Sequence, residues 1–128
     1  MKFNREMLAA TTIRQVSADG IRIADRVYTG TLAVTTDSVV EDWTHKTIPE
    51  LLTQDFAGLL EQQPEVVLLG TGATPCFAPR ELMFGFARLG IGFETMDTKA
   101  AARTFNVLAG EDRRVVAVLF PDTRNNNS

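Results

Sequence analysis

Two side chains of this sequence, Cys76 and His45, could act as nucleophile and base. A thiol near the start of a helix can be activated for attack, and a neighbouring histidine commonly serves as its base. The chain contains one cysteine and one histidine, and nothing in their positions marks them as partners. They also fall short of the four ligands of a structural zinc site. We therefore expect an incidental cysteine, a histidine in a loop, no catalytic set and no metal site.

A glycine loop, Gly70-Thr71-Gly72, follows the apolar run 66–69, which is typical of a strand buried on both faces. Such a loop can cradle a phosphate or nucleotide at the carboxyl end of the strand. However, no third glycine and no Gly-Lys-Ser/Thr follows, and residues 71–78 separate Gly70 from the helix expected at Pro79. A tight turn that needs positive φ explains the glycines better, so we expect no bound cofactor. The alternative is that residues 70–79 bind an anionic metabolite or carry out an enzymatic function.

Several polar side chains follow further along the chain, and two of them, Glu94 and Asp97, could act as acid and base. Structural roles are the stronger interpretation: Asp97 caps a helix, Arg103 pairs with a carboxylate, and Asn106 binds a loop backbone. If a pocket exists, the residues expected to line it are Gly70, Gly72, Thr74, Glu94, Asp97, Arg103 and Asn106.

The expected helix 79–89 places Arg80, Phe84 and Arg88 four residues apart on one face. Aromatic side chains and arginine are enriched at protein interfaces, so this face is a candidate partner surface. Burial of Phe84 beneath the N-terminal strands is an equally good interpretation.

The N-terminal third of the chain, residues 1–46, reads as short strands. Alternation at 20–23 and 31–35, with a further strand at 39–43, predicts an antiparallel β-meander. Residues 47–62 then carry apolar side chains at helical spacing. This helix could start at a capping box on Thr47 or, if shorter, at Thr53.

From residue 50 onward, helices alternate with strands, which predicts a layered α/β core with a mainly parallel sheet. The elements expected after the glycine loop are helix 79–89, strand 91–95, helix 98–109 and strand 115–120. We expect one domain over residues 1–121 and a polar, disordered tail over 122–128.

Composition narrows the function classes. The 128 residues carry a net charge of −3 without a basic block, which argues against nucleic-acid binding. No apolar run approaches the ~20 residues of a spanning helix, and the N-terminus lacks the features of a signal or transit peptide. We expect a soluble, cytoplasmic protein without membrane insertion.

One string is more specific than the glycines. It runs Glu94-Thr-Met-Asp-Thr98, then Ala101-Ala-Arg-Thr-Phe-Asn-Val-Leu108, and is accompanied by Gly70, Pro79 and Arg114. The chain thereby resembles a family of small domains of unknown function that includes mitochondrial respiratory complex I (NADH:ubiquinone oxidoreductase) assembly factor 3, and it looks like a bacterial-type member.

The resemblance implies a three-layer α/β fold, with a central mixed β-sheet flanked by helices and an N-terminal antiparallel β-meander. Because a mixed sheet contains at least one antiparallel strand, we expect the last strand of the chain to run antiparallel to its neighbours. The family supplies no catalytic residues, and its best-known role is assembly through protein contacts. The function that we expect is therefore a non-enzymatic protein-interaction or assembly-factor-like module, with a protein partner still to be identified.

Overall fold

The computed structural model describes residues 10–123. Its centre is a five-stranded sheet in the order β5-β4-β8-β6-β7. The strands are β4 (Leu32–Val34), β5 (Val39–Val40), β6 (Val66–Gly70), β7 (Gly92–Met96) and β8 (Val115–Leu119). Strand β6 pairs in parallel with β7 and β8, whereas β4 is antiparallel to both β8 and β5. The sheet is therefore mixed, as the resemblance implied.

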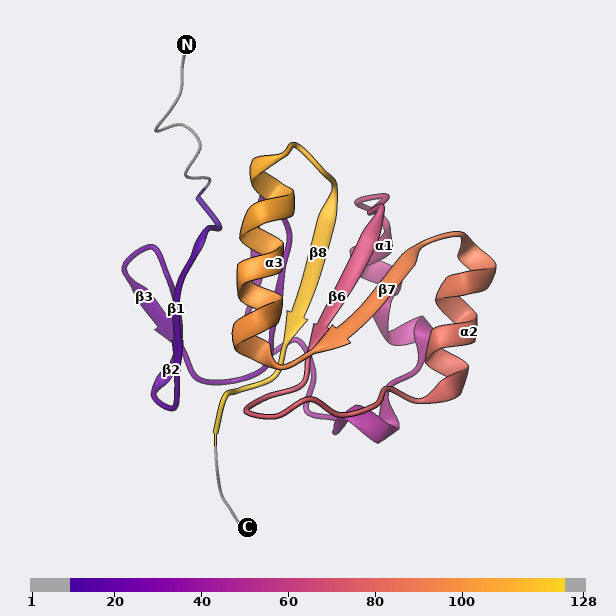
Figure 1. Ribbon diagram of the computed structural model, residues 1–128, viewed down its shortest axis with the longest axis horizontal. Helices are drawn as coiled ribbons and strands as arrows, with labels where there is room; N and C mark the ends of the chain where they lie inside the picture. Colours follow the sequence, from indigo (N-terminus) through magenta and orange to yellow (C-terminus); the bar gives the residue numbers. More distant parts are fainter. Residues whose placement is uncertain (1–9, 124–128) are drawn as a thin grey trace.

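The last strand is not the antiparallel one, so that expectation was wrong. Strand β8 runs parallel to β6 because helix α3 (Thr98–Gly110) carries the chain back across the sheet before β8 begins (Figure 1). The antiparallel neighbour of β8 is β4, which enters from the N-terminal part of the chain.

The predicted meander divides between two sheets. Strands β1 (Ile13–Ser17), β2 (Gly20–Ile23) and β3 (Arg26–Tyr28) form a separate antiparallel sheet beside α3 (Figure 1). Strands β4 and β5 instead extend the central sheet. The reason lies in β4, whose three residues are all fully buried, since such a strand needs cover on both faces.

Two hydrophobic cores lie on opposite faces of the central sheet. Along β8, Val115, Ala117 and Leu119 face the layer made by α3 and the small sheet, while Val116 and Val118 face the other layer. That second layer contains α2 (Arg80–Leu89) and the segment before β6. The result is the expected three-layer α/β arrangement (Figure 1).

The predicted helix over 47–62 is broken into η2 (Ile48–Glu50), η3 (Thr53–Phe56) and the single turn α1 (Ala57–Leu60). Leu51 and Leu52 between the first two have extended backbone, which interrupts the helix. Pro49 lies in the first turn of η2, where proline is tolerated. The Glu50 carboxylate accepts the Thr47 N–H at 2.7 Å, so the start at Thr47 is capped as predicted. Thr53 caps nothing; the cap of η3 is Leu52.

Helices α2 and α3 agree with prediction to within a residue at each end. Gly90 ends α2 with φ of 72°, and the Asp97 carboxylate caps α3 by accepting the Ala100 N–H at 2.9 Å. The buried side of α2 is narrower than its apolar pattern suggests: Leu82 and Phe86 are buried, but Met83 and Leu89 are half exposed. Within residues 10–123, no helix is long and apolar enough to span a membrane.

Candidate functional site

The glycine loop is tied to the neighbouring strands by its own backbone. The amides of Thr71 and Gly72 donate to Met96 O at 2.9 Å and to Thr98 Oγ1 at 2.8 Å. Gly72 has a φ of 102°, the positive value expected of a turn that needs glycine. These two N–H groups are therefore already used within the fold and are not available to an anion.

Thr98 is the centre of this connection. Its side chain is fully buried, and its hydroxyl accepts the Gly72 N–H and donates to Phe120 O at 2.7 Å. Its own N–H donates to Gly72 O at 2.9 Å. Thr98 thus joins the ends of β6 and β8 to the start of α3, although its neighbour Asp97, and not Thr98, was among the residues expected to line a pocket.

The polar residues proposed to line a pocket are spread over several elements. Thr74 lies exposed in the loop and Glu94 exposed on the edge strand β7, while Asp97 caps α3. Arg103 and Asn106 lie further along α3, beside a hollow of about 210 Å³ bordered by β1. The structure therefore brings Arg103 and Asn106 together, but it places them away from the glycine loop.

Asn106 has a structural contact that matches its predicted role. Its side-chain amide accepts the N–H of Ile13 and donates to the carbonyl of Ile13, both at 2.9 Å. It therefore pairs with β1 as a neighbouring strand would, and fastens the small sheet to α3. The backbone that it binds belongs to a strand, whereas the sequence predicted a loop.

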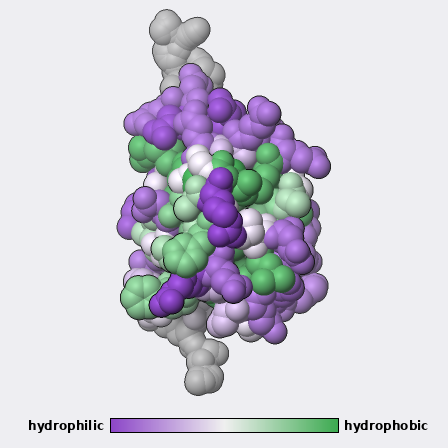
Figure 2. Space-filling view, turned by 90° about the vertical axis from the view of Figure 1, so that its right-hand side faces the viewer, coloured by the Kyte–Doolittle hydropathy of each residue, from purple (hydrophilic) through white to green (hydrophobic). Residues whose placement is uncertain are grey.

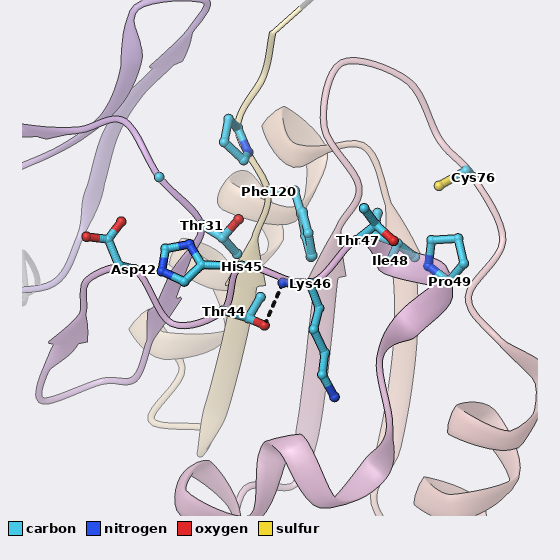
Figure 3. Close-up of a pocket in the computed structure, with 12 residues that line it drawn as sticks. Thr31, Asp42, Thr44, His45, Lys46, Thr47, Ile48, Pro49, Cys76 and Phe120 are labelled. Carbon is cyan, nitrogen blue, oxygen red and sulfur yellow. Dashed lines mark hydrogen bonds between the residues drawn. The ribbon is translucent and has the colours of Figure 1, made fainter.

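The carboxyl ends of β6 and β8 border a larger hollow of about 480 Å³ that the sequence did not predict (Figure 3). It is lined by segment 42–49, by Gly30 and Thr31 before β4, by Phe120 and Pro121 after β8, and by Cys76 of the glycine loop. Sequence gave no signal for it because its walls come from segments far apart along the chain.

Cys76 and His45, judged unrelated from sequence, both border this hollow. Figure 3 shows them on opposite sides of it, with Phe120 and Thr47 between. They form no hydrogen-bonded pair among the described residues. The thiol is exposed, so the two groups share a hollow without the contact that activates a nucleophile.

One pair of opposite charges lies beside the hollow. The Lys46 ammonium donates to both carboxylate oxygens of Asp55, at 2.8 and 3.0 Å. Burial alone would raise the pKa of Asp55, but hydrogen bonds from Lys46 and the Leu52 N–H outweigh it and the pKa is lowered. The pKa of Glu50 is also lowered, chiefly by the Thr47 N–H that it accepts. Within residues 10–123, no cluster of three metal-ligating side chains forms.

The candidate partner surface on α2 is exposed. Phe84 is 54% accessible, and Arg80 and Arg88 are exposed on either side of it. It is therefore not buried beneath the N-terminal strands, which lie on the opposite face of the central sheet. A hollow of about 440 Å³ between α2 and η3 adjoins this surface, lined by Leu52, Leu82, Phe84 and Arg88 among others.

Figure 2 views the side of the molecule on which α2 lies and shows hydrophobic areas interrupted by strongly hydrophilic ones. Phe77, in the loop that leads into α2, is 96% exposed, the highest value among the large apolar side chains of residues 10–123. Nothing in the sequence selects Phe77, since an exposed phenylalanine cannot be told from a buried one without its spatial neighbours.

Comparison with known proteins places this fold in a family. The model described as "Protein of unknown function (DUF498/DUF598)" matches residues 13–120. NADH dehydrogenase (ubiquinone) 1 alpha subcomplex assembly factor 3 of Danio rerio is 32% identical over 119 residues, covering 91% of this chain and 68% of the relative. An uncharacterised protein of Rhodobacter capsulatus is 36% identical over 102 residues, and the match covers 78% of this chain and 76% of the Rhodobacter protein.

A solved structure supports the same family assignment. The crystal structure of a Bordetella parapertussis protein superimposes with a TM-score of 0.80 at 30% identity, covering 89% of this chain and 98% of that one. The family resemblance inferred from the string at 94–108 is thus confirmed. Since the family model covers most of the described residues, the chain belongs to the DUF498/DUF598 family of proteins of unknown function.

Proposed function

We propose that this protein is a non-enzymatic, assembly-factor-like module that acts in the cytoplasm by binding another protein through the exposed face of α2. The observation that carries the proposal is Phe84, 54% exposed between two exposed arginines. Similarity to an assembly factor over 91% of the chain supports the same class of function.

The chemistry of the α2 face suits a protein partner. An aromatic side chain flanked by arginines is the composition enriched in the parts of interfaces that contribute most to affinity. Arg80 and Arg88 form no ion pair within residues 10–123, so their guanidinium groups can bind carboxylates of a partner. The adjoining hollow, with the half-exposed Leu52, enlarges the apolar area available for contact.

The name of the Danio rerio relative suggests which partners to examine first, namely subunits of the respiratory NADH dehydrogenase. The experiment is affinity purification of the tagged chain from cells that produce it, followed by quantitative mass spectrometry. Wild type is compared with Phe84→Ala combined with Arg88→Glu. Val107→Ala is the matched control, since Val107 is 58% exposed on α3, on the other face of the sheet.

We expect dehydrogenase subunits to be enriched with wild type and with Val107→Ala, and lost with the α2 double variant. Truncating an aromatic at the centre of an interface costs at least about 2 kcal/mol, or roughly 30-fold in affinity. Equal enrichment with the double variant would show that α2 is not the interface. If neither these subunits nor any other protein is enriched over an untagged control, the proposed class of function is wrong.

A further inference from the structure

The hollow at the carboxyl ends of β6 and β8 lies where the chain reverses its direction through the sheet. After β6, the chain moves by α2 to β7 on one side; after β7, it returns by α3 to β8 on the other. In open α/β sheets, ligands bind beside the carboxyl ends of the strands at such a reversal. A volume of about 480 Å³ is within the usual range for small-molecule sites.

A buried polar group borders the same hollow. Thr31 is only 8% exposed, and its hydroxyl has no hydrogen-bond partner within residues 10–123. Figure 3 shows Thr31 among the side chains around the hollow, close to Phe120 in this view. Buried hydroxyls are almost always satisfied, so a polar atom entering the hollow would supply a partner that the described fold does not.

The apolar part of the lining comes from Phe120 and Pro121 after β8 and from Ile48 and Pro49 of η2. The backbone of Phe120 is held on both sides, because its N–H donates to Gly70 O at 2.9 Å and its carbonyl accepts the Thr98 hydroxyl. Its aromatic ring is therefore attached to a fixed point of the fold. Aromatic rings pack well against the faces of other planar rings.

The charges of the lining disfavour an anion. Lys46 is the only lysine or arginine among the residues around the hollow, and its ammonium is bound to both oxygens of Asp55. Asp42, beyond His45 at one edge of the hollow in Figure 3, contributes a carboxylate. A phosphorylated metabolite would thus find no unpaired lysine or arginine in this lining, and the amides of Thr71 and Gly72 are already used.

We propose that this hollow binds an uncharged, planar nitrogen heterocycle, with the face of the ring against Phe120 and a ring polar atom hydrogen-bonded to the Thr31 hydroxyl. This ligand differs from the anionic metabolite considered for residues 70–79. The site is independent of the α2 face, because its walls are formed by other segments of the chain.

Cys76 provides a reporter, since it is exposed, borders the hollow and is the only cysteine of the chain. The purified chain is treated with iodoacetamide, and the rate of alkylation is followed by intact mass with and without each probe. The neutral probes are adenine, adenosine, indole and quinoline; AMP and inorganic phosphate are the charged ones. Amide chemical shifts of Thr31 and Phe120 report occupancy independently of the thiol.

We expect at least one neutral probe to slow alkylation and to shift both amides in a saturable way, and AMP to bind less tightly than adenosine. Thr31→Val should weaken binding about fivefold through loss of one hydrogen bond without lowering Tm, because its hydroxyl has no partner within residues 10–123. Phe120→Leu should also weaken binding, and Val107→Ala should leave it unchanged.

Three results would overturn the proposal. One is the absence of binding by every neutral probe up to its solubility limit. Another is tighter binding of AMP or phosphate than of the neutral probes. The third is unchanged affinity in both Thr31→Val and Phe120→Leu. None of these bears on the α2 interface, which is tested with a protein partner.

Discussion

Thr98 fastens the glycine loop to the end of β8, and Thr98→Val removes its hydroxyl while nearly preserving its volume. The variant loses two hydrogen bonds, from Gly72 N–H at 2.8 Å and to Phe120 O at 2.7 Å. Because the threonine side chain is fully buried, the valine methyl group would face the Gly72 N–H and exclude water from it. The variant therefore isolates the contribution of the hydroxyl.

The expected loss of stability is about 3 kcal/mol, because a buried group left without a partner costs about 1–3 kcal/mol. The Gly72 N–H carries most of this cost, since the bond to Phe120 is only partly buried and its carbonyl can recruit water. Unfolding entropy is about 2.1 cal/mol/K per residue, which for 128 residues is about 270 cal/mol/K. The corresponding fall in Tm is about 11 °C.

The assay is urea denaturation at 25 °C together with scanning calorimetry, comparing wild type, Thr98→Val and Thr98→Ser. Serine retains the hydroxyl and loses one methyl group, so it should cost only about 1 kcal/mol. If Thr98→Val is within 0.5 kcal/mol of wild type, or if Thr98→Ser is the more damaging variant, the hydroxyl does not hold the loop and the reasoning fails.

Three further variants test other contacts. Gly85→Ala should destabilise the fold by about 1–3 kcal/mol, because the new methyl group would collide with Thr53. Adding Thr53→Ala should recover part of this loss in urea denaturation. Strictly additive changes in unfolding free energy for the two substitutions would contradict the collision. Lys46→Gln should reduce the loss of stability in acid. The pKa of Asp55 is lowered in the folded protein, so its stabilising contribution is complete above the unfolded-state pKa near 3.8 and is lost as pH falls through the folded-state pKa. Urea midpoints measured over a pH series should therefore change less below about pH 4 in the variant, and identical series for variant and wild type would refute the role of the pair. Asn106→Ala should cost about 2 kcal/mol and increase amide hydrogen exchange in β1 more than in β6; uniform exchange would show that Asn106 does not fasten the small sheet.

Local signals predicted most of the secondary structure after residue 64. The apolar runs at β6 and β8, the Asp97 cap and Gly90 each specify a conformation through near neighbours in sequence. The segment over 47–62 was predicted less well, because its apolar spacing fits a helix while the extended backbone at Leu51 and Leu52 interrupts it.

The candidate site was less predictable than the fold. The exposure of Phe84 and Phe77 depends on what packs over them, and the hollow beside Phe120 is formed by four segments that meet only in three dimensions. Asn106 was expected to bind a backbone, yet its partner Ile13 lies 93 positions away. Spacing along one element cannot identify such contacts.

The sequence by itself determined the α/β class, the family string at 94–108 and the turn at Gly72, because each follows from local backbone preference or from residue identity. Tertiary structure alone decided that β4 joins β8, that β8 is parallel to β6, and that the loop amides are bound to Met96 and Thr98. The physical reason is that pairing and burial depend on groups distant in sequence. For this reason the loop after β6, which the sequence favoured as a structural turn over an anion site, contributes Cys76 to the wall of a hollow whose other residues lie far away in the sequence.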